Sequence, residues 1–123
     1  MRVFIANFGR GNYDWPECLA RNVVATSNDE AAHSFWIQGD RDSYVDYCIH
    51  HSETAVGITP TRPVASRWFN LMTVVAETSG DIWFHREKDE LWWSLSKLDP
   101  PTITLEDDPN PQMRINELLF AWR

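Results

Sequence analysis

The stretch from Asp81 to Ser96, DIWFHREKDELWWSLS, decides the fold of this chain. Two runs rich in aromatic and apolar residues flank a charged tip, Glu87–Glu90, and this pattern is typical of a β-hairpin. Successive side chains of a strand point to opposite faces, so either Trp92 or Trp93 must point inward. By the same alternation, one face of the first strand carries Ile82, Phe84 and Arg86, and the other carries Trp83 and His85.

A helix is predicted before the hairpin. It should begin at Ser66 or a neighbour and end at Thr78-Ser79-Gly80. Residues 59–63 before it should form an extended loop, because a residue that precedes proline is disfavoured in a helix. The apolar positions that share one face of this helix are Trp68, Leu71, Met72 and Val75.

The N-terminal part contains a strand and three helical segments. Val3–Ala6 is a short hydrophobic strand that ends in a polar turn over residues 7–12. Asp14 should cap a short helix, and Ser27 or Asn28 should cap a second one that runs to Trp36. Asp40 should cap a third helix that ends at His50 and His51 and has an apolar stripe formed by Tyr44, Val45, Cys48 and Ile49.

The C-terminal part adds a strand candidate, Thr102–Leu105, and a closing segment. This segment, residues 114–123, is amphipathic and is compatible with either a helix or a strand. The predicted fold class is therefore α+β. The length fits a single domain over residues 1–123.

Negative charge is concentrated away from most of the tryptophans. The net charge is −7, and residues 25–56 hold six acids and one base. Residues 57–98 contain four of the seven tryptophans, and their charges balance. This distribution argues against a non-specific phosphate binder, which needs a basic surface, but it is compatible with a pocket that binds one base.

The sequence also limits the compartment and the membrane partners. No apolar run approaches the ~20 residues that span a bilayer. The N-terminus is predicted to be a strand and a turn rather than a signal peptide. Since no export signal is predicted and there are only two cysteines, Cys18 and Cys48, we expect free thiols, a cytoplasmic location and no membrane partner. Neither cysteine has a metal-ligand spacing.

Catalytic and metal-binding patterns are weak. His50 and His51 point ~100° apart on a helix, so they cannot easily share an ion. Gly9 and Gly11 lack the third glycine and the lysine of phosphate-binding loops. We therefore expect no metal, no cofactor and no catalytic residue. One enzymatic alternative remains, a small hydrolase that uses His85 with one of the acids.

Aromatic rings accompanied by polar side chains are the strongest functional signal. Seven tryptophans exceed what a core of this size needs, and partly exposed rings stack on flat ligands. An asparagine amide offers a donor and an acceptor side by side, which suits the edge of a heterocycle. Turn chemistry at Asn7 and Asn12 and helix capping at Ser66 explain the same polar residues equally well.

Two parts of the chain resemble EVE domains of the PUA-like superfamily, whose relatives include YTH domains. Asn12-Tyr13-Asp14-Trp15, after the first strand, is similar to the element that follows the first strand of an EVE domain. Ser66–Leu71, a helix and then Gly80–His85 are similar to a later EVE segment. The resemblance covers residues 1–24 and 60–96, whereas residues 25–59 depart from it.

This resemblance implies a PUA-like curved sheet or small barrel with flanking helices and an aromatic cage for a flipped, modified base. We expect that base to be 5-methylcytosine or 5-hydroxymethylcytosine in DNA, as bound by the specificity modules of modification-dependent nucleases. The sequence has no nuclease motif, so any cleavage would belong to a missing portion or a partner. The base-binding residues implied by position are Asn7, Phe8, Trp15, Ser66, Arg67, Trp68, Asn70, Trp83, His85 and Trp93.

A second interpretation needs no nucleic acid. Exposed tryptophans also suit the centre of a protein–protein interface. The acidic helical segment within residues 25–56 would then contact a basic partner. Replacing Trp15 or Trp68 would weaken a protein complex in this case, and nucleic acid would have no effect.

Overall fold

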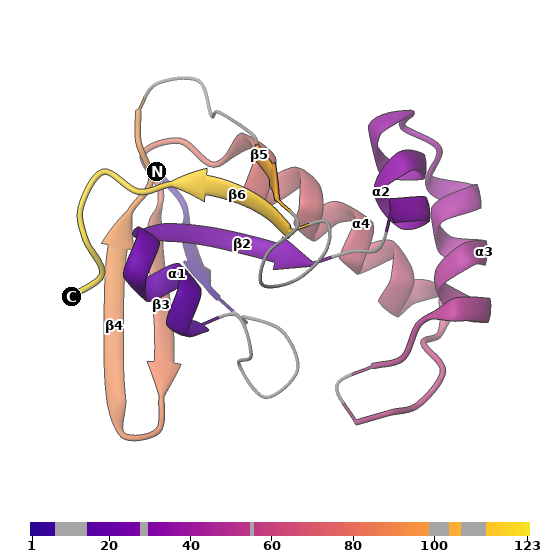
Figure 1. Ribbon diagram of the computed structural model, residues 1–123, viewed down its shortest axis with the longest axis horizontal. Coiled ribbons are helices and arrows are strands. Elements are labelled where there is room, and N and C mark those ends of the chain that lie inside the picture. Colours follow the sequence, from indigo (N-terminus) through magenta and orange to yellow (C-terminus); the bar gives the residue numbers. More distant parts are fainter. Residues whose placement is uncertain (7–14, 28–29, 55, 99–103, 107–112) are drawn as a thin grey trace.

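The computed structural model describes residues 1–6, 15–27, 30–54, 56–98, 104–106 and 113–123, and its fold is α+β, as predicted (Figure 1). Two three-stranded sheets and the first helix lie at one end of the molecule, the second and third helices lie at the other end, and the fourth helix runs between them. The strands are β1 (Val3–Ile5), β2 (Val23–Ser27), β3 (Ile82–Glu87), β4 (Glu90–Leu95), β5 (Thr104–Glu106) and β6 (Met113–Glu117). The helices are α1 (Trp15–Arg21), α2 (Glu30–Ile37), α3 (Arg41–His51) and α4 (Arg62–Glu77).

The predicted hairpin is confirmed as β3 and β4, with a turn formed by Lys88 and Asp89. Lys88 has φ 54°, the left-handed conformation that tight hairpin turns favour. The turn places Glu87 opposite Glu90 and His85 opposite Trp92. Side chains alternate as expected, because Trp83 and His85 are buried whereas Ile82 and Phe84 are only partly buried.

The two sheets are joined along the C-terminal segment. The first sheet has the order β1-β3-β4, with β1 parallel to β3, and the second has the antiparallel order β2-β6-β5. A β-bridge links Ser96 to Leu118. Further along, the backbone N–H groups of Trp93 and Arg123 donate to each other's carbonyl oxygens at 2.8 and 3.0 Å. The chain end therefore continues the first sheet beyond β4.

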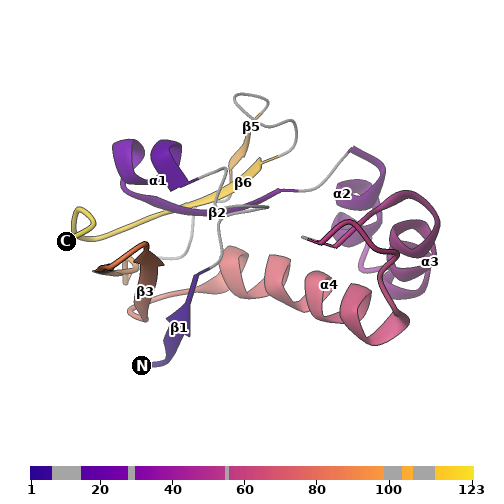
Figure 2. The same ribbon diagram turned by 90° about the horizontal axis from the view of Figure 1, so that it is seen from below.

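Helix α4 connects two hydrophobic cores (Figures 1 and 2). Its C-terminal part contributes Val75 to the core between the sheets and α1. Its first half and middle contribute Ala65, Phe69 and Met72 to a second core with α2 and α3. The predicted stripe of α3 is confirmed, since Tyr44 and Cys48 are fully buried in this second core.

Three expectations need correction. Strand β2 was not predicted, although the run Val23-Val24-Ala25 is buried against β6. Helix α4 begins at Arg62 rather than Ser66, because the Thr61 side chain accepts a hydrogen bond from Val64 N and a proline is tolerated in the first turn. Leu71, expected on the buried face of this helix, is exposed.

Other boundaries agree with the sequence. Asp40 caps α3, since its side chain accepts a hydrogen bond from Ser43 N at 3.1 Å. The closing segment, left open between helix and strand, contains β6. Asp14, Asn28 and residues 102–103 lie outside the described residues, so the expectations placed on them stay untested.

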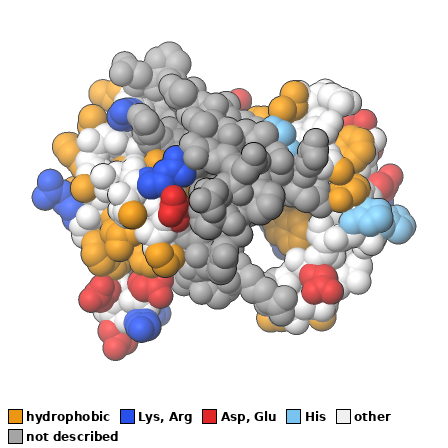
Figure 3. All heavy atoms as spheres, viewed as in Figure 1, with side chains coloured by type: hydrophobic (Ala, Val, Ile, Leu, Met, Phe, Trp, Pro, Cys, Tyr) orange, Lys and Arg blue, Asp and Glu red, His pale blue; other side chains and the backbone are white. Residues whose placement is uncertain are grey.

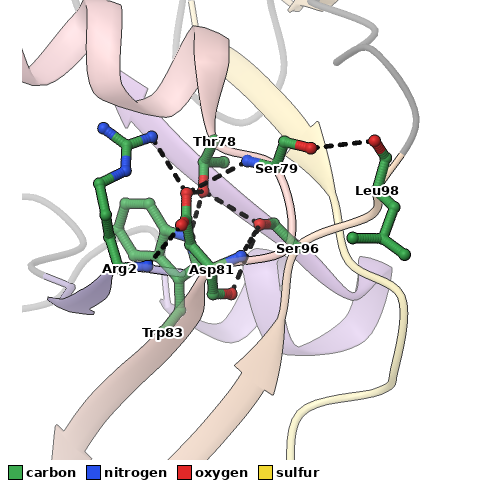
Figure 4. A network of polar contacts seen from close by, with 7 residues as sticks. All are labelled: Arg2, Thr78, Ser79, Asp81, Trp83, Ser96 and Leu98. Atoms are coloured by element: carbon green, nitrogen blue, oxygen red, sulfur yellow. Dashed lines mark hydrogen bonds and ion pairs between the residues drawn. The ribbon is translucent and has the colours of Figure 1, made fainter.

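A buried polar network fixes the start of the hairpin (Figure 4). The Asp81 carboxylate accepts hydrogen bonds from Arg2 N at 2.8 Å, Arg2 Nη2 at 3.1 Å, Thr78 Oγ1 at 2.8 Å and Ser79 N at 3.2 Å. Ser96 Oγ accepts from Asp81 N at 2.9 Å. The network therefore ties the N-terminus, the end of α4 and both hairpin strands to one buried carboxylate.

This network predicts a loss of stability in acid. Burial alone would raise the pKa of Asp81, but the hydrogen bonds from Arg2, Thr78 and Ser79 outweigh it and lower the pKa from 3.8 to about 2. A carboxyl group with a lowered folded pKa contributes stability above its unfolded pKa and loses that contribution as the pH falls through the folded pKa. From pH ~5 to ~2, we expect Asp81 to account for a loss of about 2 kcal/mol.

Urea denaturation at several pH values measures this contribution. The Asp81→Asn variant, which cannot titrate at this position, should lack that part of the pH dependence. An equally steep loss of stability in the variant would mean that other carboxyl groups cause the acid sensitivity.

Candidate functional site

The structure distributes the predicted base-binding residues over separate places. Asn7 and Phe8 lie outside the described residues. We call the face of the first sheet that packs against α1 and β2 its inner face, and the opposite face its outer face. Trp83 and His85 lie on the inner face and Trp15 packs over it, whereas Trp93 lies on the outer face. The remaining group, Ser66, Arg67, Trp68 and Asn70, lies on the N-terminal half of α4 beside α3.

Trp15 and His85 come together although they are distant in the sequence. Their ring centroids are 4.1 Å apart at an interplanar angle of 38°. Trp92 and Trp122 contact Trp15 edge-on at 5.6 and 5.3 Å. We call Trp15, His85, Trp92 and Trp122 the inner aromatic cluster. Trp92 is its only partly exposed member, and the other three are buried.

The hairpin register, helix α1 and the chain end place the members of this cluster. The hairpin register sets His85 opposite Trp92, and opposite residues of an antiparallel pair point to the same face. Trp15 is the first residue of α1, which packs next to β2 over that face. The Trp122 indole donates from Nε1 to the Val23 carbonyl oxygen at 3.1 Å, which fixes the chain end against β2.

Two carboxylates border the cluster at the hairpin turn. Glu87 Oε2 lies 3.0 Å from His85 Nε2, and Glu90 Oε2 accepts a hydrogen bond from Trp92 Nε1 at 3.2 Å. An ionised carboxylate only accepts hydrogen bonds, so the first contact favours a proton on His85 Nε2. The Glu87 side chain is 29% exposed, and Glu90 is exposed. The charged turn projects at the lower left of Figure 3.

This arrangement combines an aromatic surface with hydrogen-bond acceptors. A partly exposed indole offers a face for stacking. A carboxylate beside it accepts hydrogen bonds from an amino group such as cytosine N4. These are the two elements needed to bind a planar base with an exocyclic amine.

Trp83 is buried in the core on the inner side of the first sheet. Its ring packs on Phe4 with a centroid separation of 4.7 Å, and its Nε1 donates to Thr78 Oγ1 at 3.0 Å. Only 2% of its surface is exposed. In this conformation the ring is part of the core.

The group on α4 is engaged by Arg41 from α3. Arg41 donates from Nη1 to Ser66 Oγ at 2.9 Å and from Nη2 to Asn70 Oδ1 at 2.7 Å. Its guanidinium also lies 4.6 Å from the ring centroid of Phe69. Trp68 packs against the second core, and Arg67 is exposed. Ser66 and Asn70 therefore link two helices at the surface beside the second core, away from Trp15 and His85.

The sequence interpretation missed Trp92, Glu87 and Glu90 as site residues. It treated Glu87–Glu90 as one solvated tip, which left the register of the hairpin open. A turn of only Lys88 and Asp89 sets the pair Glu87–Glu90 opposite each other and directs Trp92 to the face of His85. The length of the turn was the signal that identifies the inward tryptophan.

In the part of the chain that the structure describes, no group of three His, Cys, Asp or Glu residues could hold a metal ion. No helix among these residues is long and apolar enough to cross a bilayer. Comparisons with protein-family models, with curated proteins and with solved structures found no match to this chain.

Proposed function

We propose that this chain is a non-enzymatic domain that binds a flipped, modified nucleobase. The observation that supports this proposal is the contact of Trp15, from a distant part of the sequence, with His85 and Trp92 of the hairpin, where Glu87 and Glu90 border the cluster. Trp15 and His85 are also residues that the resemblance to EVE domains implied. The proposed ligand is DNA that carries 5-methylcytosine or 5-hydroxymethylcytosine.

In this proposal the base stacks on the partly exposed face of Trp92. Its exocyclic amine donates to Glu90 or Glu87, as cytosine N4 donates to carboxylates elsewhere. Extrusion of the base from a duplex costs a few kcal/mol, and stacking offsets this cost by ~1–3 kcal/mol per ring contact. Trp15 contacts the Trp92 ring edge-on and is itself in contact with His85, so these rings support the position of Trp92.

The proposal extends to the fold and to the partner. Strand β4 contacts the C-terminal segment at Ser96–Leu118, so the two sheets could curve into a PUA-like barrel. A domain without catalysis would act as a specificity module. Any cleavage of the DNA would belong to a fused portion or to a partner nuclease.

Fluorescence anisotropy with oligonucleotides that differ at one cytosine tests the proposal. We expect affinity for the modified base to exceed that for cytosine roughly tenfold, which is what one small apolar group contributes in a fitted pocket. Trp92→Ala should weaken binding by ~1–3 kcal/mol, because one stacking contact is removed. Trp92→Phe should retain part of the affinity.

Variants of the hairpin turn provide a matched control. Glu90→Gln should reduce the affinity for the modified base, whereas Asp89→Asn, in the same turn, should leave it unchanged. Equal affinity for both oligonucleotides, or no binding to either, would exclude the proposed function. A protein complex disrupted by Trp68→Ala would instead support the interaction module.

A further inference from the structure

The outer face of the first sheet is apolar and open. By the strand registers it carries Val3, Ile5, Ile82, Phe84, Arg86, Leu91, Trp93 and Leu95. Val3, Ile5, Leu91 and Trp93 are exposed by 60, 84, 66 and 41%. Apart from Arg86, every side chain at these positions of β1, β3 and β4 is apolar. Such a contiguous exposed patch indicates a binding surface rather than incidental exposure.

No described helix or strand covers this face. Helix α1 and strands β2 and β6 lie on the inner side of the sheet, and the opposite side is bare of described elements (Figure 2). The core cluster that involves this sheet includes Phe4, Trp83 and Trp92, all from the inner face. The outer face therefore has no partner within the described part of the chain.

Four side chains of this face form a row across β1, β3, β4 and the chain end. Ile5 is the register partner of Phe84, and Phe84 is the partner of Trp93. Trp93 and Arg123 exchange both backbone hydrogen bonds, so the Arg123 side chain lies on the same face. At a strand spacing of ~4.8 Å, the row Ile5–Phe84–Trp93–Arg123 extends over about 14 Å.

The charge of this face is opposite to that of the whole chain. The net charge is −7, yet the charged side chains at the positions named above are Arg86 and Arg123. The acids of the hairpin strands, Glu87 and Glu90, belong to the inner face. Two aromatic rings and two guanidinium groups, with no Asp or Glu side chain at these positions, suit a ligand that has flat rings and negative charge.

We propose that this outer face binds single-stranded nucleic acid. Unpaired bases would stack on Trp93 and Phe84, and phosphates would lie near Arg86 and Arg123. A duplex keeps its bases stacked inside, so it cannot use an aromatic platform in this way. The surface lies on the opposite side of the sheet from the inner aromatic cluster, and it would bind unmodified bases, so the inference does not depend on the proposed function.

Anisotropy titration of the whole chain with a fluorescent, unmodified thymidine 12-mer tests this inference. Trp93→Ala should weaken binding roughly tenfold, because stacking on one ring is lost, and Trp93→Phe should restore part of it. Replacing both Arg86 and Arg123 with glutamine should reduce the slope of log K against log salt by ~0.7 per charge removed. Ile37→Ala, which removes an exposed apolar side chain of α2 outside this face, is the control and should bind the 12-mer as the parent does.

Each alternative result overturns the inference. Absence of binding by the parent chain would exclude the site, as would equal affinity for a duplex of the same sequence. So would a Trp93→Ala variant that binds with unchanged affinity while circular dichroism shows a native fold. Dimerisation that Trp93→Ala abolishes, seen by sedimentation without the 12-mer, would assign the face to a second copy instead.

Discussion

Replacing Asp81 with asparagine should lower the free energy of unfolding by about 3 kcal/mol, because a buried charge that accepts several hydrogen bonds is lost. The carboxylate is 3% exposed, and both of its oxygens accept. An asparagine amide group in place of Oδ2 would turn its N–H donors toward the N–H donors of Arg2 Nη2 and Ser79. Urea denaturation followed by tryptophan fluorescence at pH 7 measures the change.

The control for this prediction is Asp89→Asn, the same substitution at the exposed turn of the same hairpin. It should change the stability by less than about 0.5 kcal/mol, as is usual for surface positions. Arg2→Ala should show an intermediate loss, because it removes the side-chain contact with Asp81 and keeps the backbone one. A stability equal to that of the parent in Asp81→Asn would show that the network does not hold the hairpin.

The hairpin and the third helix could be predicted because their signals are local. Alternation over residues 82–86 fixes which side chains are buried, and Asp40 caps α3 through a contact three residues away. Strand β2 was missed because its stability comes from pairing with β6, a partner distant in the sequence. Short apolar runs such as Val23-Val24-Ala25 do not reveal such a partner.

The candidate site could be predicted only in part, for the same reason. The resemblance to EVE domains named Trp15 and His85, and the structure brings their rings into contact. It also named Ser66 and Asn70, which accept hydrogen bonds from Arg41 beside the second core. No local pattern near Ser66 indicates that its hydroxyl accepts a hydrogen bond from the guanidinium of Arg41 on α3. The assignment of side chains to one site depends on helix packing, which the sequence alone did not determine.

Trp83→Ala should destabilise the protein by ~3–5 kcal/mol, the usual cost of truncating a buried tryptophan. The ring fills the space beside Phe4 and donates to Thr78 Oγ1, which itself donates to Asp81. The variant would therefore leave a cavity and also weaken the Asp81 network. Thermal unfolding monitored by circular dichroism should show a large fall in Tm.

Trp93→Ala is the matched control, because it removes the same side chain from the neighbouring strand of the same sheet, on its outer face. Its effect on stability should be at most about 1 kcal/mol, since the ring is exposed. Trp83→Phe should lie between the two, because the smaller ring keeps most of the packing and loses the bond to Thr78. If Trp83→Ala instead kept the parental Tm and lost only affinity for a modified base, Trp83 would line a ligand pocket, as the resemblance implied. A loss of stability in Trp83→Ala with a native Tm in Trp93→Ala would separate core tryptophans from those available to a ligand.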